Sequence, residues 1–113
     1  MPMFMIQGKN NGQSWASRIY NPRKGRGELV EKVWKETNAK ILVDYFTLGE
    51  YDFLIILDVP NQASVAAIAR AMAASGMLSE DPKVTPILSP EEHREALAKA
   101  KTFKYPPPWE EKA

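Results

Sequence analysis

Three residues whose side chains could take part in catalysis or ligand binding lie around one predicted hairpin. Asp52 follows a tight turn and opens an otherwise apolar strand, where its carboxylate could act as a general base or bind a donor group of a ligand. An Asp beside a hairpin also commonly accepts backbone N–H hydrogen bonds that fix the turn. Tyr45 and Tyr51 flank the same turn, and either hydroxyl could reach a cleft, although strand tyrosines more often belong to the core. Asp52 and Tyr51 are therefore candidate catalytic residues, and Tyr45 is a candidate ligand-binding residue.

His93 is the only histidine in the sequence and the third candidate catalytic residue. Imidazole is the side chain best suited to acid–base work near neutral pH. His93 stands in the first turn of a predicted helix with charged neighbours on both sides. A role on a solvated helix surface is therefore the competing interpretation.

The segment 9–27 is polar and basic, and it also carries two aromatic residues. Its cations precede a predicted helix start, where positive charge opposes the helix dipole unless an anion lies between them. The pattern therefore predicts a site for a phosphate or carboxylate, with a solvated basic loop as the competing interpretation. The cations are Arg18, Arg23, Lys24 and Arg26. The candidate ligand-binding residues are Trp15, Arg18, Tyr20, Trp34 and Tyr45.

Composition narrows the class of protein. A chain of 113 residues is long enough for one core but not for two. Fifteen basic against fourteen acidic residues give a net charge of +1, which argues against a dedicated nucleic-acid binder. The absence of cysteine removes disulfides, thiolate nucleophiles and thiolate metal ligands. We expect no metal, no cofactor, no membrane partner and a cytoplasmic location.

Hydrophobic patterning predicts the order β-α-β-β-α-β, which is typical of ferredoxin-like α+β folds with a four-stranded antiparallel sheet. Strands are expected at 3–7, 41–48, 51–59 and 83–88, and helices at 27–37 and 62–74. A tight turn at Gly49-Glu50 joins the second and third strands. Ser89 and Glu92 form a capping box that starts a C-terminal helix reaching residue 101. The domain therefore covers residues 1–101, and a Pro-rich arm of polyproline II type covers 102–113.

The two central strands are apolar on both faces, which indicates assembly. In the second strand Ile41, Val43 and Tyr45 are expected on one face, and Leu42, Phe46 and Leu48 on the other. Two helices can cover only one face of such a sheet. A second copy is the better cover for the other face. If roughly 800 Å² per subunit is buried and ~60% of it is apolar, the gross gain is ~12 kcal/mol per subunit.

The run from Tyr45 to Asp52 (YFTLGEYD), followed by an apolar strand and Val59-Pro60, resembles the GYD-domain family. Agreement continues through an Ala-rich helix ending Ala74-Ser75-Gly76 and through the segment 85–92 (TPILSPEE). The resemblance covers roughly residues 28 to 100 and implies a dimeric α/β-barrel assembly, in which two sheets pack face to face. Two features depart from the family pattern. Asn38-Ala39 stands where a Gly-Gly pair is usual, and the 9–27 segment is longer and more aromatic than is usual, with the Pro-rich tail additional.

These features together predict a homo-oligomeric small-molecule-binding protein with its ligand cleft between sheet and helices. The expected partners are further copies of the chain and a small anionic or aromatic ligand. One alternative is a cofactor-independent dimeric α/β-barrel enzyme, of monooxygenase or isomerase type, that uses Asp52 and a hairpin tyrosine. Another alternative is a structural subunit that docks on a larger complex through its tail.

Overall fold

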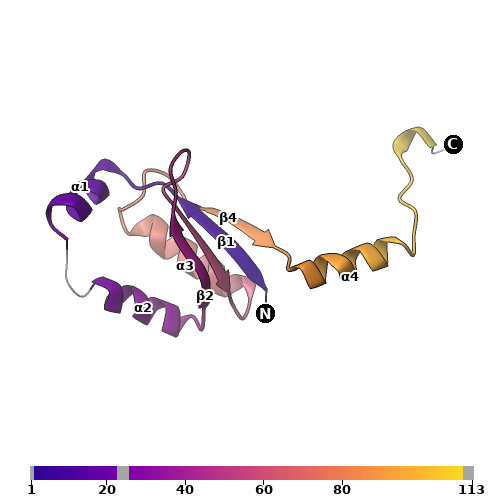
Figure 1. The fold of residues 1–113 in the computed structure, drawn as a ribbon, viewed down its shortest axis with the longest axis horizontal. Coiled ribbons are helices and arrows are strands. Elements are labelled where there is room, and N and C mark those ends of the chain that lie inside the picture. The colour runs from indigo at the N-terminus through magenta and orange to yellow at the C-terminus, as the bar shows by residue number, and fades with distance from the viewer. Residues whose placement is uncertain (1, 23–25, 111–113) are drawn as a thin grey trace.

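The computed structural model describes residues 2–22 and 26–110, and it confirms an α+β fold built on a four-stranded antiparallel sheet (Figure 1). The strand order is β2-β3-β1-β4, and all three neighbouring pairs are antiparallel. This order, with helices in the β1–β2 and β3–β4 connections, is consistent with a ferredoxin-like fold. The elements are β1 (Met3–Gly8), α1 (Gly12–Tyr20), α2 (Arg26–Glu36), β2 (Lys40–Phe46), β3 (Phe53–Asp58), α3 (Gln62–Ala74), β4 (Lys83–Ile87), α4 (Pro90–Ala100) and a 3₁₀ turn, η1 (Pro108–Glu110).

The core lies between one face of the sheet and the helices α2 and α3. Alternate residues of β1 and β3 point toward this face, so their burial follows the two-residue period of a strand. Helix α3 adds a buried stripe at the spacing expected of an amphipathic helix, and α2 adds the indole of Trp34. The core residues are Phe4, Ile6, Trp34, Phe53, Ile55, Leu57, Val59, Val65 and Ile68.

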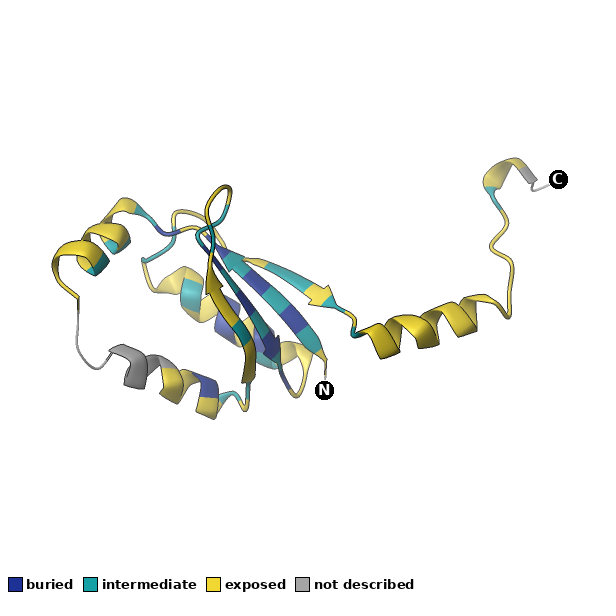
Figure 2. Cartoon of the chain, viewed as in Figure 1, coloured by how far each residue is buried: buried dark blue, intermediate teal, exposed yellow. Residues whose placement is uncertain are grey.

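The opposite face of the sheet, here called the outer face, is only partly covered (Figure 2). The residues of β1 and β3 that alternate with the core are half-buried, although both core-forming helices lie on the other side. Helix α4 could have covered part of this face within a single chain. It instead projects away from the sheet beyond β4, carrying the tail with it, and each of its residues is exposed (Figure 2).

The expected helix ends are confirmed. Asn38 ends α2 in the left-handed conformation with φ of 55°, and Gly76 follows α3 with φ of 79°. The capping box of α4 is complete, because Ser89 Oγ accepts from the Glu92 N–H at 3.0 Å and the Glu92 carboxylate accepts from the Ser89 N–H at 3.1 Å. The backbone and side-chain hydrogen bonds from Ser89 lower the pKa of Glu92.

Three local predictions are wrong. The 9–27 segment is not simply a loop, because α1 forms within it, with the Asn11 side chain accepting from the Ser14 N–H at 2.8 Å. The connection between β2 and β3 is longer than a tight turn, since β2 ends at Phe46 and β3 begins at Phe53. The end of the tail is a 3₁₀ turn at Pro108–Glu110 rather than polyproline II.

The predicted alternation along β2 is also wrong, because a register shift between Ile41 and Val43 interrupts it. Ile41 pairs with the core residue Leu57, whereas Val43 pairs with the outer-face residue Ile56. Val43 and Tyr45 therefore lie on the outer face, and Ile41 does not share that face with them. An extra residue in one strand reverses the direction of every side chain beyond it. The shift turns Asp44 and Phe46 toward the helices.

The close approach of β1 to a core ring gives a first test. A Cβ built on Gly8 would collide with the Phe53 ring, whereas a Cβ on Gly12 would meet no heavy atom within 4 Å. Gly8→Ala should lower the free energy of unfolding by about 1–3 kcal/mol through overpacking. The matched variant Gly12→Ala lies in a helix and should be neutral or stabilising by up to ~1 kcal/mol. Denaturant unfolding of both variants measures the difference, and equal stability would contradict this packing.

Candidate functional site

An open cleft of about 290 Å³ lies between the helices and the sheet. Its floor is formed by β2 and β3, and its walls by α2 and α3. Most of the lining is apolar, and two charged side chains, Arg18 and Asp44, complete it. The lining residues are Arg18, Val33, Trp34, Asp44, Phe46, Phe53, Ile55, Ile68, Ala71, Met72, Ser75 and Met77. Apolar walls with few polar groups are typical of small-molecule sites.

The cleft exists because the helices leave β2 uncovered on the side that faces them. Phe46 points to the helix side of the sheet, as its pairing with Phe53 requires, yet it is 69% exposed. Trp34 from α2 is 8% exposed and closes one side of the opening. If the helices covered the whole of this face, Phe46 would be buried as Phe53 is. The exposed ring instead forms part of a concave apolar wall.

A second, polar cavity of about 400 Å³ adjoins the cleft. It lies between α1 and the end of α3, and it shares Arg18, Ser75 and Met77 with the cleft. Both the side chain and the backbone of Asn11 connect these segments, because Asn11 Nδ2 donates to the Gly76 carbonyl at 2.6 Å and the Asn11 N–H donates to the Met77 carbonyl at 3.0 Å. The remaining lining residues are Gln13, Ser14, Ser17, Asn21, Pro22 and Gly76.

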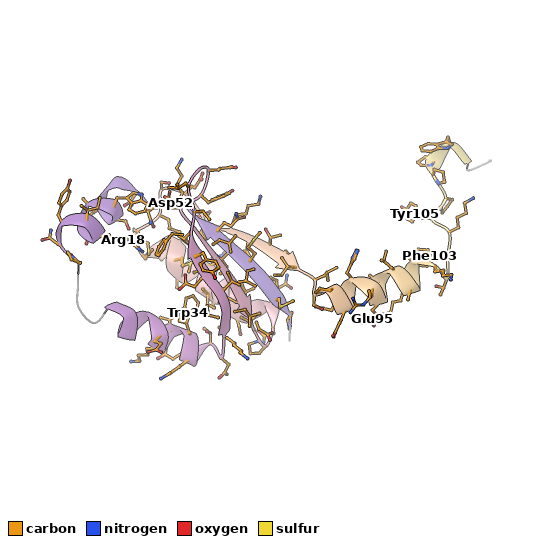
Figure 3. The ribbon with its side chains drawn as sticks, viewed as in Figure 1. Arg18, Trp34, Asp52, Glu95, Phe103 and Tyr105 are labelled. Atoms are coloured by element: carbon orange, nitrogen blue, oxygen red, sulfur yellow. The ribbon has the colours of Figure 1, made fainter. Side chains whose placement is uncertain are left out.

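Arg18 lies at the junction of the two cavities. Its guanidinium carbon lies 5.9 Å from the centroid of the Phe46 ring, within the range of a cation–π contact. Figure 3 shows Arg18 on α1 and Trp34 on α2, both on the side of the sheet that carries the cleft. The structure thus brings together two of the candidate ligand-binding residues, which stand far apart in the sequence.

The other candidate ligand-binding residues do not line either cavity. Trp15 and Tyr20 lie on α1, and Tyr20 is 76% exposed. Tyr45 lies on the outer face, because it pairs with Leu54 on the far side of the register shift. Of the other predicted cations, Arg23 and Lys24 lie outside the described residues, as does the side chain of Arg26.

Asp52 forms part of the hairpin's hydrogen-bond network. Its Oδ2 accepts from the Asn10 N–H at 2.8 Å, its own N–H donates to the Gly8 carbonyl at 2.8 Å, and its carbonyl accepts from the Thr47 N–H at 2.8 Å. Thr47 Oγ1 also donates to the Tyr51 carbonyl at 2.7 Å. The Tyr51 ring has the Lys83 ammonium 6.0 Å from its centroid. These contacts fix the β2–β3 connection against the end of β1. Asp52 thus has the hydrogen bonds expected of a residue that fixes a turn.

His93 is far from both the hairpin and the cleft. It lies in the first turn of α4, and its backbone N–H donates to the Ser89 carbonyl at 2.9 Å. Because α4 projects beyond β4, His93, Asp52 and Tyr51 do not form one constellation (Figure 1). Within residues 2–22 and 26–110, no group of three or more His, Asp or Glu side chains is placed to hold a metal ion. No helix in those two ranges is both long and apolar enough to cross a membrane.

Sequence reasoning missed most of the cleft lining. Phe53, Ile55 and Ile68 read as ordinary core residues, which they also are. Asp44 and Phe46 enter the cleft only through the register shift in β2, which no residue type in that strand announces. The position of Arg18 follows from α1. The Asn11 cap and the i, i+4 spacing of Trp15 and Ile19 were the signals that could have predicted this helix.

The fold and the cleft define a small ferredoxin-like α+β domain with a ligand-sized opening between helices and sheet. The sequence model of the GYD domain matches residues 4–97, most of the chain. The chain therefore belongs to the GYD domain family. No curated protein and no solved structure gives a significant match.

The structural role of Asp52 predicts a specific pattern of stability. Asp52→Ala leaves the Asn10 N–H without its acceptor and should lower the free energy of unfolding by about 1–3 kcal/mol. Asp52→Asn should cost less, because its amide oxygen can accept the same hydrogen bond. Asp81→Ala, at an exposed position, is the control. Denaturant unfolding checks the order, and wild-type stability of Asp52→Ala would contradict it.

Proposed function

We propose that this protein is a homo-oligomeric small-molecule-binding protein whose ligand lies in the cleft between the sheet and the helices. The main support is the concave wall formed by Trp34, Phe46 and Phe53. The Phe46 ring in this wall is exposed, whereas Trp34 and Phe53 beside it are buried. An apolar ligand there would cover surface that the chain leaves in contact with water.

The size of the cleft sets the size of the ligand. An apolar cavity of about 150 Å³ holds a single benzene ring, so a cleft of about 290 Å³ suits a body of one or two rings. Trp34 closes one wall of the cleft and is much less exposed than Trp109 in the tail. Its indole therefore serves as a local reporter of occupancy.

The outer face supports the homo-oligomeric part of the proposal. Apolar residues from all four strands lie on it, and they are half-buried or exposed in the single chain. A second copy packed sheet to sheet would remove this surface from water in the way that interface cores do. The apolar residues of this face are Met3, Met5, Val43, Tyr45, Leu54, Ile56 and Ile87.

The projecting arm supports a second candidate role, in which the tail docks on a neighbouring subunit or a larger complex. Helix α4 has eleven residues, and helices of that length are marginal in water without packing. Its Leu97 and the tail residues Phe103, Tyr105 and Trp109 are all exposed, and Figure 3 labels Phe103 and Tyr105 beyond the end of the helix. An arm with this composition gains stability by burying these side chains against a partner.

An enzyme that uses Asp52 and a hairpin tyrosine has less support. The Asp52 carboxylate holds the Asn10 N–H, and neither Asp52 nor Tyr51 lines the cleft or the polar cavity. A general base must lie within hydrogen-bond reach of its substrate.

Ligand binding in the cleft is tested with a neutral two-ring probe, 2-naphthylacetamide. At about 0.3 kcal/mol for each of its ~14 non-hydrogen atoms, the probe should bind with a Kd near 1 mM. Addition of the probe should shift the NMR signals of the Trp34 indole N–H and of the Ala71 and Met72 amides. Ala71→Phe should block the cleft and abolish the shifts, because Ala71 lines it.

The matched control is Ala67→Phe, on the same helix but outside the lining. It should bind the probe as the wild type does. Unchanged binding by Ala71→Phe, or no perturbation of Trp34 in the wild-type protein, would contradict the cleft as the binding site.

Assembly is tested by two variants that act on different surfaces. Ile56→Glu places a charge in the middle of the outer face and should convert the oligomer to monomers in sedimentation velocity. Deletion of residues 102–113 should leave the number of subunits unchanged if the sheets form the interface. A smaller number of subunits would instead support an interface made by the tail. Ala67→Glu, on exposed α3 surface, is the control for added charge. A wild-type protein that is monomeric at all concentrations would overturn the proposed assembly.

A further inference from the structure

Two cavities of different character meet at one cation. The cleft is lined mainly by aromatic and aliphatic side chains, whereas the lining of the adjoining cavity combines Pro22 and Met77 with several hydroxyl and amide side chains. Arg18, Ser75 and Met77 belong to both linings, so a single ligand can extend from one cavity into the other. The combined space suits a molecule with an apolar body and a polar head.

The charges of the polar cavity decide which head fits. Among the residues that the structure describes, its lining contains one cation, Arg18, and no carboxylate. Ser14, Ser17 and Ser75 supply hydroxyl donors, and Gln13 and Asn21 supply amide donors. A carboxylate or phosphate would form charge-assisted hydrogen bonds with the guanidinium, whereas a cationic head would bring a second positive charge beside it.

Arg18 is suited to this role by its shape as well as its charge. A guanidinium offers five N–H donors, so it can hold a ligand oxygen while it keeps its protein contacts. Its distance of 5.9 Å from the Phe46 ring centroid also places the cation beside the apolar wall. The anion and the ring of one ligand would therefore contact neighbouring groups of the protein.

Asp44 is the one acidic residue among the described residues that line the two cavities. It is therefore the residue that a cationic ligand would pair with. It lies on β2 in the apolar cleft and does not line the polar cavity. A cationic ligand would thus have to place its charge in the apolar cleft and leave the donor-rich cavity unused. The separation of the two charged residues favours an anionic head at Arg18.

We propose that the ligand of this protein is a small amphipathic anion, with a body of one or two rings in the cleft and a carboxylate or phosphate held by Arg18 in the adjoining polar cavity. This inference rests on the proposed function, since it assigns the chemistry of the ligand for the same cleft.

The experiment compares probes that share the naphthalene body and differ in the head group. 2-Naphthylacetate and 2-naphthyl phosphate carry the anion, 2-naphthylacetamide is neutral, and 2-naphthylethylamine is cationic. NMR titration should show at least one anionic probe binding about tenfold tighter than the amide, and the amine binding no tighter than the amide. The better of the two anions identifies the head group as carboxylate or phosphate.

Variants then locate the preference. Arg18→Met keeps an unbranched apolar side chain and should bring the ratio of anion to amide affinity, both measured on this variant, from about tenfold to about one. Arg70→Met, on exposed α3 surface outside both linings, should leave every probe unchanged. Equal binding of anionic, neutral and cationic probes, or an anion preference that survives Arg18→Met, would overturn this inference alone. Failure of all four probes to bind would overturn the proposed function and this inference with it.

Discussion

The packing of β3 against α2 and α3 is the interaction on which the rest of the structure depends. β3 lies between β1 and β2, and it presents Phe53, Ile55 and Leu57 to the helices. Burial of each such side chain contributes about 1.5–3 kcal/mol. The same strand presents Leu54 and Ile56 to the outer face, so one six-residue segment supplies both the core and the proposed interface. The Phe53 ring also lies against Gly8 of β1, and Phe53 lines the cleft.

The sheet therefore has two incompletely covered faces with different consequences. On the helix side, the uncovered part is concave and small, because Trp34, Phe46 and Met72 surround it, and its volume suits a small molecule. On the outer face, the uncovered part spans all four strands, and its apolar residues are the ones that the proposed sheet-to-sheet interface would bury. The arm adds a third apolar surface, and its capped helix keeps that surface away from the sheet of its own chain.

Local chemistry explains which features the sequence predicts. Caps depend on single residues, so Asn38, Gly76 and the Ser89–Glu92 pair gave correct helix ends. The apolar run of β3 likewise predicts a strand, although a run that is apolar on both faces does not say which face the helices cover. The β2 register shift depends on how two strands meet, and no residue of β2 signals it, so Asp44 and Phe46 were not placed in the cleft. Arg18 was singled out for its charge, but its neighbours Phe46 and Ser75 follow from tertiary packing alone.

Native mass spectrometry of the freshly purified 113-residue chain is the most direct test of assembly and ligand binding together. It reports the number of subunits and any retained small molecule in one spectrum. We expect a dimer or larger homo-oligomer, with an additional small mass that is lost on denaturation. A monomer without any bound mass at micromolar concentration would contradict it, because both uncovered faces of the sheet would then stand in water without a partner.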